Sequence, residues 1–428
     1  MQKTFLFITS RLPWPASTGR KASLFHYCKM LHEKFGFRVV VASFLETDER
    51  AENKPDFIDN IYVLRQPSTF EKGINLLRDT FITGRRPMQV SLYWSRRAAE
   101  QINEIVLCEK PDVVMADMIR TTEFCRGLDI LKIADFDDML SVRYYRQLDF
   151  ASEYVNPYGA YLARFGAFGK KILMSNLVKQ FVMRRESKMV ERYELEIARD
   201  YDCSIFVAQQ EADVLNSRLG FENAFAVPIG VDYDFLSEPV LPDLHFEDCI
   251  VFLGAMTATH NIQGCAYFIK DVLPLIEKDL PGIRFVVVGA NPPSALMQLA
   301  RENVEFVGWV DDVRPIAKAA KVFVCPLQFG SGIKTKNLEA MAMGIPVVTT
   351  GVGAENIDAV DGQDWLLADS AEKFAKQVIR LVCDEDCAKA IGSNGQKFVS
   401  EKWTWNAAEQ SMDKVLRKMG LDQKEIFR

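Results

Sequence analysis

The chain has 428 residues, of which 48% are hydrophobic and 26% are charged, and its formal net charge is −6. This length predicts two domains with separate cores, and the composition leaves little room for a long disordered region. The negative charge argues against general nucleic-acid binding, which needs a basic surplus, so no nucleic-acid partner is expected.

Cysteine usage and hydropathy restrict the expected location. The nine cysteines are scattered and odd in number, which is typical of a reducing compartment. No stretch reaches the roughly 18 uncharged apolar residues that a membrane-spanning helix needs, and Arg11 ends the apolar N-terminus too early for a signal peptide. We therefore expect a cytoplasmic protein, with peripheral binding to the inner membrane as an open alternative.

Short apolar runs alternate with helical patterns in the first half of the chain. The expected elements are the strands Thr4–Thr9, Arg38–Ser43, Asp112–Ala116 and Leu131–Phe136, and the helix Ala22–Phe35. Strands that alternate with helices predict a parallel sheet with helices on both faces.

The second half repeats this pattern. Its expected strands are Cys249–Leu253, Arg284–Gly289, Val304–Val307, Val322–Pro326 and Pro346–Thr350. Right-handed crossovers between them give a second doubly wound sheet. The predicted fold class is therefore α/β with two Rossmann-like parallel-sheet domains, whose ligands should bind in a cleft beyond the carboxyl ends of the strands.

A turn-rich stretch, Pro228–Asp232, separates the two halves and predicts domains over residues 1–228 and 229–407. A different pattern occupies Tyr161–Arg199, where basic and aromatic residues share long helical segments. Such helices can bind anionic membranes. The alternative is a solvated helix face that packs on its own domain.

Residues 321–350 form a complete strand–turn–helix–strand unit. Gly330 and Gly332 in its turn allow close approach to the free N–H groups that begin the helix, where a pyrophosphate can bind. Lys334 and Lys336 oppose the helix dipole at this end unless an anion compensates them. The alternative is that both lysines are simply solvated.

Glu339 lies one helical turn beyond Lys336 in an otherwise apolar run. Its two acceptor oxygens suit the vicinal hydroxyls of a ribose. For an isolated glutamate, a solvated helix position would be the simpler interpretation.

The run Asn337–Val348 resembles the Leu-Glu-Ala-Met-Ala, Gly, Pro-Val-Val signature of the retaining glycosyltransferases of family four, whose two Rossmann-like domains form the GT-B architecture. Shorter segments, among them Phe252–Met256 and Val307–Asp311, resemble the loops of the family's donor domain. The resemblance implies a nucleotide diphosphate sugar, UDP- or GDP-linked, as donor. It also implies that a helix at about 408–428 crosses back to the first domain.

The donor site that this resemblance implies places the phosphates and sugar at the helix start and the ribose at Glu339. Its residues are Gly254, Gly308, Trp309, Gly330, Ser331, Gly332, Ile333, Lys334, Lys336 and Glu339. A narrower likeness, carried by Gly254–Met256, Asp312–Arg314 and Gly332–Lys334, points to the sugar transferases of bacterial exopolysaccharide clusters.

The sequence also departs from the family. Many members have a second glutamate eight residues before Glu339, where this chain has Ser331, and a basic pair in the loop that is Thr257–Asn261 here. We expect Lys334 and Lys336 to supply the missing charge and to act as catalytic cations.

In the first domain, the loop before the first helix carries Gly19 and Arg20, which are candidates for contacting a phosphate or the acceptor. Ser17 or Thr18 as a plain helix cap is the alternative. The family's catalytic histidine has no counterpart after Asp112–Ala116, where Arg120 is a further candidate for the acceptor side.

Three aspartates follow the expected strand at 131–134. Asp135, Asp137 and Asp138 either orient the acceptor hydroxyl, with Asp137 as the candidate catalytic group, or cap the next helix, which is the slightly favoured interpretation. No metal or cofactor is expected, because these carboxylates form no spaced ligand set and cations face the diphosphate.

The resulting hypothesis is a retaining, metal-independent glycosyltransferase. It moves a sugar from a nucleotide diphosphate to a hydroxyl of a glycan or lipid-linked acceptor in polysaccharide or glycoconjugate biosynthesis. A sugar-nucleotide epimerase of the same architecture and a catalytically silent partner in a polysaccharide assembly complex are the competing hypotheses, because fold alone does not define function.

Overall fold

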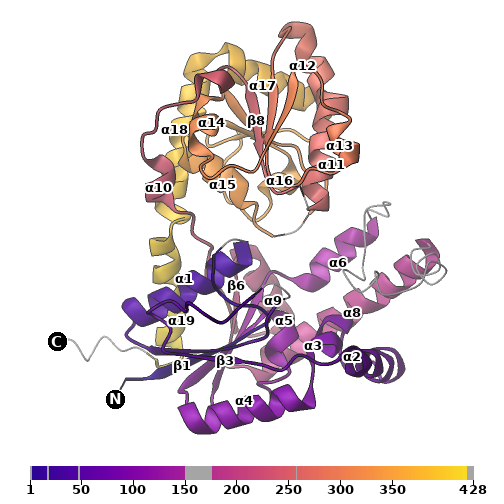
Figure 1. The fold of residues 1–428 in the computed structure, drawn as a ribbon, viewed down its shortest axis with the longest axis vertical. Helices are drawn as coiled ribbons and strands as arrows, with labels where there is room; N and C mark the ends of the chain where they lie inside the picture. The colour runs from indigo at the N-terminus through magenta and orange to yellow at the C-terminus, as the bar shows by residue number, and fades with distance from the viewer. Residues whose placement is uncertain are drawn as a thin grey trace. The chain divides into compact units, whose positions relative to one another are not determined.

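A computed structural model describes residues 2–16, 19–46, 49–149, 176–256, 258–330 and 332–421. Its internal contacts divide the chain into two compact units (Figure 1). Unit 1 comprises Met1–Pro228 together with Glu409–Arg428, and unit 2 comprises Ile229–Ala408.

Unit 1 is built on a parallel sheet of seven strands in the order β3-β2-β1-β4-β5-β6-β7. The strands are β1 Thr4–Thr9, β2 Arg38–Ser43, β3 Asn60–Val63, β4 Val113–Asp117, β5 Leu131–Asp137, β6 Cys203–Phe206 and β7 Ala224–Ala226. The central strands β1 and β4 are buried along their whole length, because helices cover both faces of the sheet.

The helices of unit 1 connect these strands as right-handed crossovers do. They are α1 Gly19–Glu33, α2 Thr69–Asn75, the π-helical η1 Leu76–Ile82, α3 Met88–Tyr93, α4 Arg96–Glu109, α5 Met118–Thr122, α6 Leu140–Asp149, α8 Asn176–Asp200, α9 Gln209–Leu219 and most of α19 Trp405–Lys418. A capping box between Ser68 and Glu71 begins α2, which continues directly into η1.

Unit 2 has a six-stranded parallel sheet in the order β10-β9-β8-β11-β12-β13. Its strands are β8 Ile250–Leu253, β9 Phe285–Val288, β10 Val304–Gly308, β11 Val322–Cys325, β12 Val347–Thr349 and β13 Leu366–Leu367. Its helices are α10 Tyr233–Ser237, η3 Leu244–Phe246, α11 Thr259–Tyr267, η4 Phe268–Val272, α12 Leu273–Asp279, α13 Ser294–Met297, α14 Arg314–Ala319, α15 Thr335–Ala342, α16 Gly351–Ala354, α17 Ala371–Cys383 and α18 Glu385–Lys402.

The predicted fold class is confirmed, since both units are doubly wound α/β sheets. In each sheet the strand order reverses at the centre, between β1 and β4 in unit 1 and between β8 and β11 in unit 2. Such switch points open a crevice at the carboxyl ends of the strands, and ligands of these folds bind there.

The predicted helical segment at 161–199 corresponds in its second part to α8, and residues 150–175 lie outside the described residues. Val190, Tyr193 and Ile197 of α8 belong to the core of unit 1. One face of α8 therefore packs in unit 1, and membrane binding by this segment stays a prediction. Within the described residues, no helix is long and apolar enough to cross a lipid bilayer.

Candidate functional site

The switch point of unit 2 begins with two loops that pack backbone against backbone. Gly254 follows β8 and Gly289 follows β9, and a Cβ atom added at Gly289 would lie 1.9 Å from the carbonyl oxygen of Gly254. No side chain fits there. Because neither glycine has a side chain, the space beyond β8 is occupied by side chains of α11 and α15.

Lys336 of α15 fills part of this space. Its ammonium group donates a hydrogen bond to Oδ1 of Asn261 and lies 4.4 Å from the centre of the Phe252 ring. Asn261 is held in turn by a 2.8 Å bond from its Nδ2 to the Ala255 carbonyl. Because a Cβ at Gly254 would lie 2.6 Å from the Lys336 Nζ, only glycine leaves room for the ammonium group.

The surroundings of Lys336 are poor in compensating charge. Burial lowers the pKa of its ammonium group, and weaker interactions with Cys325, Cys265 and Glu339 oppose that shift. No ion pair to Lys336 is found among the described residues. A buried cation that is not neutralised by a carboxylate is costly to fold, and it binds an anion strongly.

Lys334 stands at the N-cap of α15, and its side chain is also inside the protein. Only 5% of the residue is exposed, and its Nζ donates a 2.7 Å hydrogen bond to the Gly332 carbonyl. Its side chain lies against Gly330, where an added Cβ would be 3.2 Å from the Lys334 Cε. The alternative of a solvated lysine is therefore wrong for Lys334, whereas Lys336 is half-buried and its ammonium group is held by Asn261. Ser331 lies outside the described residues.

Glu339 projects from the same helix and is half-buried. Burial raises the pKa of its carboxyl group, and Lys336 partly opposes this shift. Within the described part of the chain, its carboxylate makes no hydrogen bond or ion pair. Both carboxylate oxygens are therefore available to hydroxyl groups.

The remaining predicted donor residues lie at the same edge of the sheet. Gly308 ends β10 with a positive φ of 85°, and the adjacent Trp309 is 70% exposed. Gly332 and Ile333 are half-buried in the turn before α15. The described donor candidates thus lie at the end of β10, in the loops that follow β8, β10 and β11, and on α15.

Unit 1 has a second charged cluster at its own switch point. Arg20, in the first turn of α1, makes ion pairs of 2.6 Å with Asp117, 2.6 Å with Asp135 and 3.1 Å with Asp137. Asp117 ends β4 and also accepts hydrogen bonds from the N–H and hydroxyl of Ser10, which follows β1. The Arg20 guanidinium is therefore committed to protein carboxylates.

The three aspartates of this cluster differ in their pKa values because one cation serves all of them. Although burial opposes ionisation, Arg20 and the Ser10 bonds lower the pKa of Asp117. Burial raises the pKa of Asp135 to about 6 and also raises that of Asp137, with Arg20 opposing both shifts. Only Asp137 can be reached by a ligand, because 26% of its side chain is exposed, compared with 1–2% for the others.

The structure corrects the interpretation of these aspartates as helix caps. Strand β5 extends to Asp137, so Asp135 and Asp137 lie within it and not beyond it. Asp138 forms an ion pair with Arg143, while the Ser141 N–H at the start of α6 donates to Glu194. Arg20 and Arg143 bind these carboxylates in preference to the N–H groups at the start of α6, because the guanidinium groups carry full charges.

Two other candidates of the first domain are separate from the cluster. Arg120 of α5 donates to Gln89 at 3.0 Å and stacks 5.5 Å from the Tyr93 ring. Gly19 begins α1, with nothing within 4 Å of an added Cβ. Ser17 and Thr18 lie outside the described residues.

Sequence reasoning missed Asn261 and Asp117 as site residues. Asn261 closes the loop that departs from the family pattern, but that departure did not indicate its bond to Lys336. Asp117 is the last residue of a buried strand, and a carboxylate at such a position was the available signal.

The fold defines a class of proteins with two doubly wound α/β units. Residues 247–384 match the family model of "Glycosyl transferases group 1". This segment, which contains every described donor candidate of unit 2, is similar to the group 1 glycosyltransferases.

Curated relatives match over part of their length. An uncharacterised protein from the cps region of Klebsiella pneumoniae is 23% identical over 219 residues, which is 49% of this chain and 54% of that protein. A GDP-mannose-dependent phosphatidylinositol monomannoside mannosyltransferase of Mycobacterium tuberculosis is 29% identical over 161 residues, which is 34% of this chain and 42% of the enzyme. The matches thus span about half of these relatives.

Solved structures match over nearly the whole chain. Sucrose-phosphate synthase from Thermosynechococcus elongatus has a TM-score of 0.65 at 15% identity and covers 98% of this chain and 99% of its own. HepE from Anabaena, solved with UDP, has a TM-score of 0.65 at 13% identity and covers 97% and 99%. The likeness confirms the GT-B fold.

Proposed function

We propose that the chain is a glycosyltransferase whose unit 2 binds a nucleotide diphosphate sugar and whose unit 1 binds the acceptor. The observation that carries this proposal is the half-buried side chain of Lys336, whose ammonium group lies at the switch point of unit 2 and makes no ion pair with a carboxylate among the described residues. Bond cleavage leaves a nucleoside diphosphate, and a fixed cation stabilises the charge that develops on it.

The other residues of unit 2 have complementary roles in this proposal. The N–H groups at the start of α15 and the Lys334 side chain face the diphosphate. Glu339 accepts hydrogen bonds from the ribose hydroxyls, and the loop at Gly308 and Trp309 receives the base. The structural relative HepE was crystallised in complex with UDP, which supports a nucleotide of this kind.

In unit 1, we assign the contact with the acceptor hydroxyl to Asp137. Its raised pKa gives the carboxyl group an enhanced affinity for a proton, and it is the exposed member of its cluster. Asp117 and Asp135 hold Arg20, which keeps Asp137 in place. These groups are thus positioning residues.

The finer aspects of the proposal rest on the family resemblance. They are retention of anomeric configuration, independence of metal ions, a UDP- or GDP-linked donor, and a glycan or lipid-linked acceptor at the cytoplasmic face of the membrane. The relative from the cps region of Klebsiella supports a role in polysaccharide biosynthesis. The mycobacterial relative, whose name specifies a phosphatidylinositol mannoside, supports a lipid-linked acceptor.

The decisive experiment separates the function of Lys336 from its effect on stability. Lys336→Met keeps the apolar stem over Phe252 and removes the ammonium group. We expect donor binding to weaken by about 1.5–3 kcal/mol, as for a charge-assisted hydrogen bond. The melting temperature without ligand should stay level or rise, because a buried charge is lost.

The measurement is calorimetry and thermal shift with UDP, GDP, ADP and their sugar conjugates. Lys376→Met, at an exposed position of α17, is the matched control and should bind like the wild type. If Lys336→Met binds every nucleotide as the wild type does, the donor site lies elsewhere.

The two competing functions predict different products. An epimerase changes the nucleotide sugar when no acceptor is present, and a silent assembly partner consumes no donor with any acceptor. Incubation of the donor that binds best, alone and then with glycan or lipid-linked acceptors, distinguishes them. Transfer requires release of free nucleoside diphosphate in step with acceptor glycosylation.

A further inference from the structure

The continuous helix formed by α2 and η1 in unit 1 has its polar face inside and its apolar face outside. Asn75, Asp79 and Thr80 are 2–5% exposed. Phe70, Ile74, Leu77, Phe81 and Ile82 are 42–77% exposed. The apolar positions recur at helical spacing, so they form one row along the helix. A folded protein rarely leaves such a row in water unless something else covers it.

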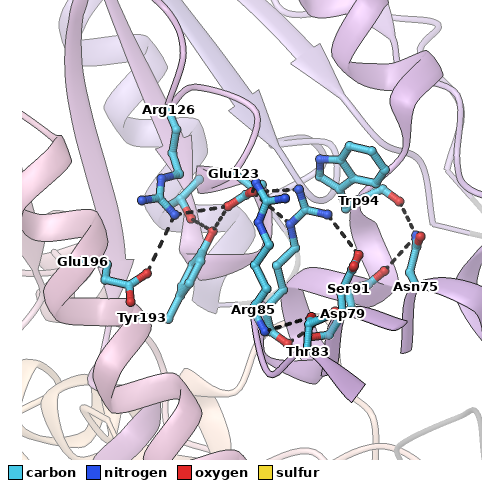
Figure 2. Close-up of polar contacts among 12 residues, drawn as sticks. Asn75, Asp79, Thr83, Arg85, Ser91, Trp94, Glu123, Arg126, Tyr193 and Glu196 are labelled. Atoms are coloured by element: carbon cyan, nitrogen blue, oxygen red, sulfur yellow. Dashed lines mark hydrogen bonds and ion pairs between the residues drawn. The ribbon is translucent and has the colours of Figure 1, made fainter. Parts of the chain in front are cut away.

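The inverted orientation is fixed by the contacts of the polar face, which Figure 2 shows. Asp79 forms a 3.1 Å ion pair with the buried Arg86, which is also paired at 2.8 Å with Glu123. Asn75 donates to the carbonyl oxygens of Ser91, at 3.2 Å, and Trp94, at 2.8 Å. Rotation of the helix to bury its apolar row would remove Asp79 from Arg86 and Asn75 from the two carbonyl oxygens. The loss of these partners inside the protein is unfavourable.

The network also joins the helix to α8, the neighbouring long helix of unit 1 (Figure 1). Arg185 of α8 donates to the carbonyl oxygens of Thr80, at 2.7 Å, and Phe81, at 3.1 Å. The exposed face of α8 adds Phe181, which is 68% exposed, and the exposed cations Arg184 and Lys188. These three residues share one helix face by their spacing, so the helix next to η1 exposes one further large apolar side chain and two cations.

The charge around this surface is positive, although the whole chain carries −6. Arg78 and Arg85 flank the row, with 53% and 69% of their side chains exposed, and each also pairs with a buried carboxylate, Arg78 with Asp79 at 2.7 Å and Arg85 with Glu123 at 3.8 Å. The acidic residues of 69–85 are Glu71, which closes the capping box, and Asp79, which is buried. Exposed cations beside an exposed apolar row are the features of a helix that lies in the interface of an anionic lipid bilayer.

We infer that the surface formed by α2, η1 and the exposed face of α8 docks this protein onto membranes that contain anionic lipid. The helix lies parallel to the bilayer, with Phe70, Leu77 and Ile82 inserted at the level of the headgroups and the arginines among the lipid phosphates. A second copy of the chain is a poorer occupant. A symmetric contact through this row would add the exposed cations of both copies to one interface, which is unfavourable. The inference does not depend on sugar transfer.

The test uses the full chain and flotation with two kinds of vesicle, phosphatidylcholine alone and phosphatidylcholine with about one third phosphatidylglycerol. The wild type should float with the anionic vesicles and bind the neutral ones at least about tenfold more weakly, because cations near an anionic surface add to the apolar insertion. The double variant Leu77→Glu/Ile82→Glu should lose at least about tenfold in binding to anionic vesicles. Arg184→Gln/Lys188→Gln should reduce anionic binding and leave weak neutral binding unchanged.

Leu107→Glu is the matched control, since Leu107 on α4 is 75% exposed and apolar but lies outside the row. It should bind vesicles like the wild type. All variants should show the wild-type melting temperature and the wild-type thermal shift with nucleotide, because the changed side chains lie in solvent. The inference is overturned if the wild type ignores anionic vesicles or if the Leu107 and Leu77/Ile82 variants behave alike. It is also overturned if light scattering shows a lipid-free dimer that the Leu77/Ile82 variant dissociates.

Discussion

Glu339 shows how a single side chain reveals a binding role through its energetics. Glu339 is half-buried, burial raises the pKa of its carboxyl group, and the carboxylate makes no hydrogen bond or ion pair in the described structure. A group that served only stability would have acquired such a partner.

We therefore expect Glu339→Gln to bind UDP or GDP about 1.5–3 kcal/mol more weakly than the wild type, because a charged hydrogen bond to the ribose is lost. The calorimetric comparison should include the 2′,3′-dideoxy nucleotide. The wild type should lose affinity when the hydroxyls are removed, and Glu339→Gln should lose much less. An equal loss of affinity in both proteins would show that Glu339 does not bind the ribose hydroxyls.

At this scale the sequence predicted the members of the donor site better than their partners. Lys334, Lys336 and Glu339 stand in one continuous motif, so their grouping needed no fold. The bond from Lys336 to Asn261 joins residues 75 positions apart, and the pair of Arg20 with Asp117 joins residues 97 apart. Such contacts can be predicted only when the strand order is known, because the strand order brings the two loops together.

At the scale of elements, the start of α6 depends on a buried glutamate of α8. Glu194 accepts hydrogen bonds from the Ser141 N–H, at 3.1 Å, and the Ser141 hydroxyl, at 2.5 Å. Burial raises the pKa of its carboxyl group to about 7, against the opposing effect of the Ser141 bonds. The protonated form of Glu194 is therefore the one that favours folding.

This predicts a pH dependence with a defined sign. Because the pKa is higher in the folded than in the unfolded state, the stabilising contribution of Glu194 is complete below about pH 4.5 and is lost as the pH rises through about 7. Relative to the wild type, Glu194→Gln should gain up to about 3 kcal/mol in the free energy of unfolding between pH 4.5 and pH 8.

Urea unfolding at several pH values measures this difference. Glu104→Gln on the exposed face of α4 provides the control and should track the wild type throughout. A pH-independent difference between Glu194→Gln and the wild type would show that the carboxylate is ionised in the folded state across this range.

Strands were predicted from the sequence where hydrophobic runs are uninterrupted, as at β1, β2 and β11. The strands β6 and β7 were missed, since a serine interrupts β6 and β7 has only three residues. The apolar spacing of 70–82 is that of an amphipathic helix, but a spacing does not tell which face is buried. That choice is made by Arg86, whose ion pairs hold the polar face inside.

At the scale of the whole molecule, the proposal assigns nucleotide binding to unit 2. Hydrogen exchange of the full chain with and without UDP or GDP should show slower exchange at residues 254–261 and 332–339, because bound phosphates order the helix start and the adjacent loop. The peptides of α4 should not change. Protection confined to unit 1 would contradict the assignment.

Unit 1 is assembled from two stretches of chain that are far apart in sequence. Met412, Val415 and Leu416 of α19 are buried, and Lys418 contacts both the Phe225 ring, at 4.5 Å, and Glu222. A ribosome synthesises residues 1–228 long before α19. The nascent unit 1 therefore exposes the apolar surface that α19 covers until about residue 421 has emerged. Truncations or fusions at the end of α19 should therefore harm solubility during expression more than their distance from any catalytic group would suggest.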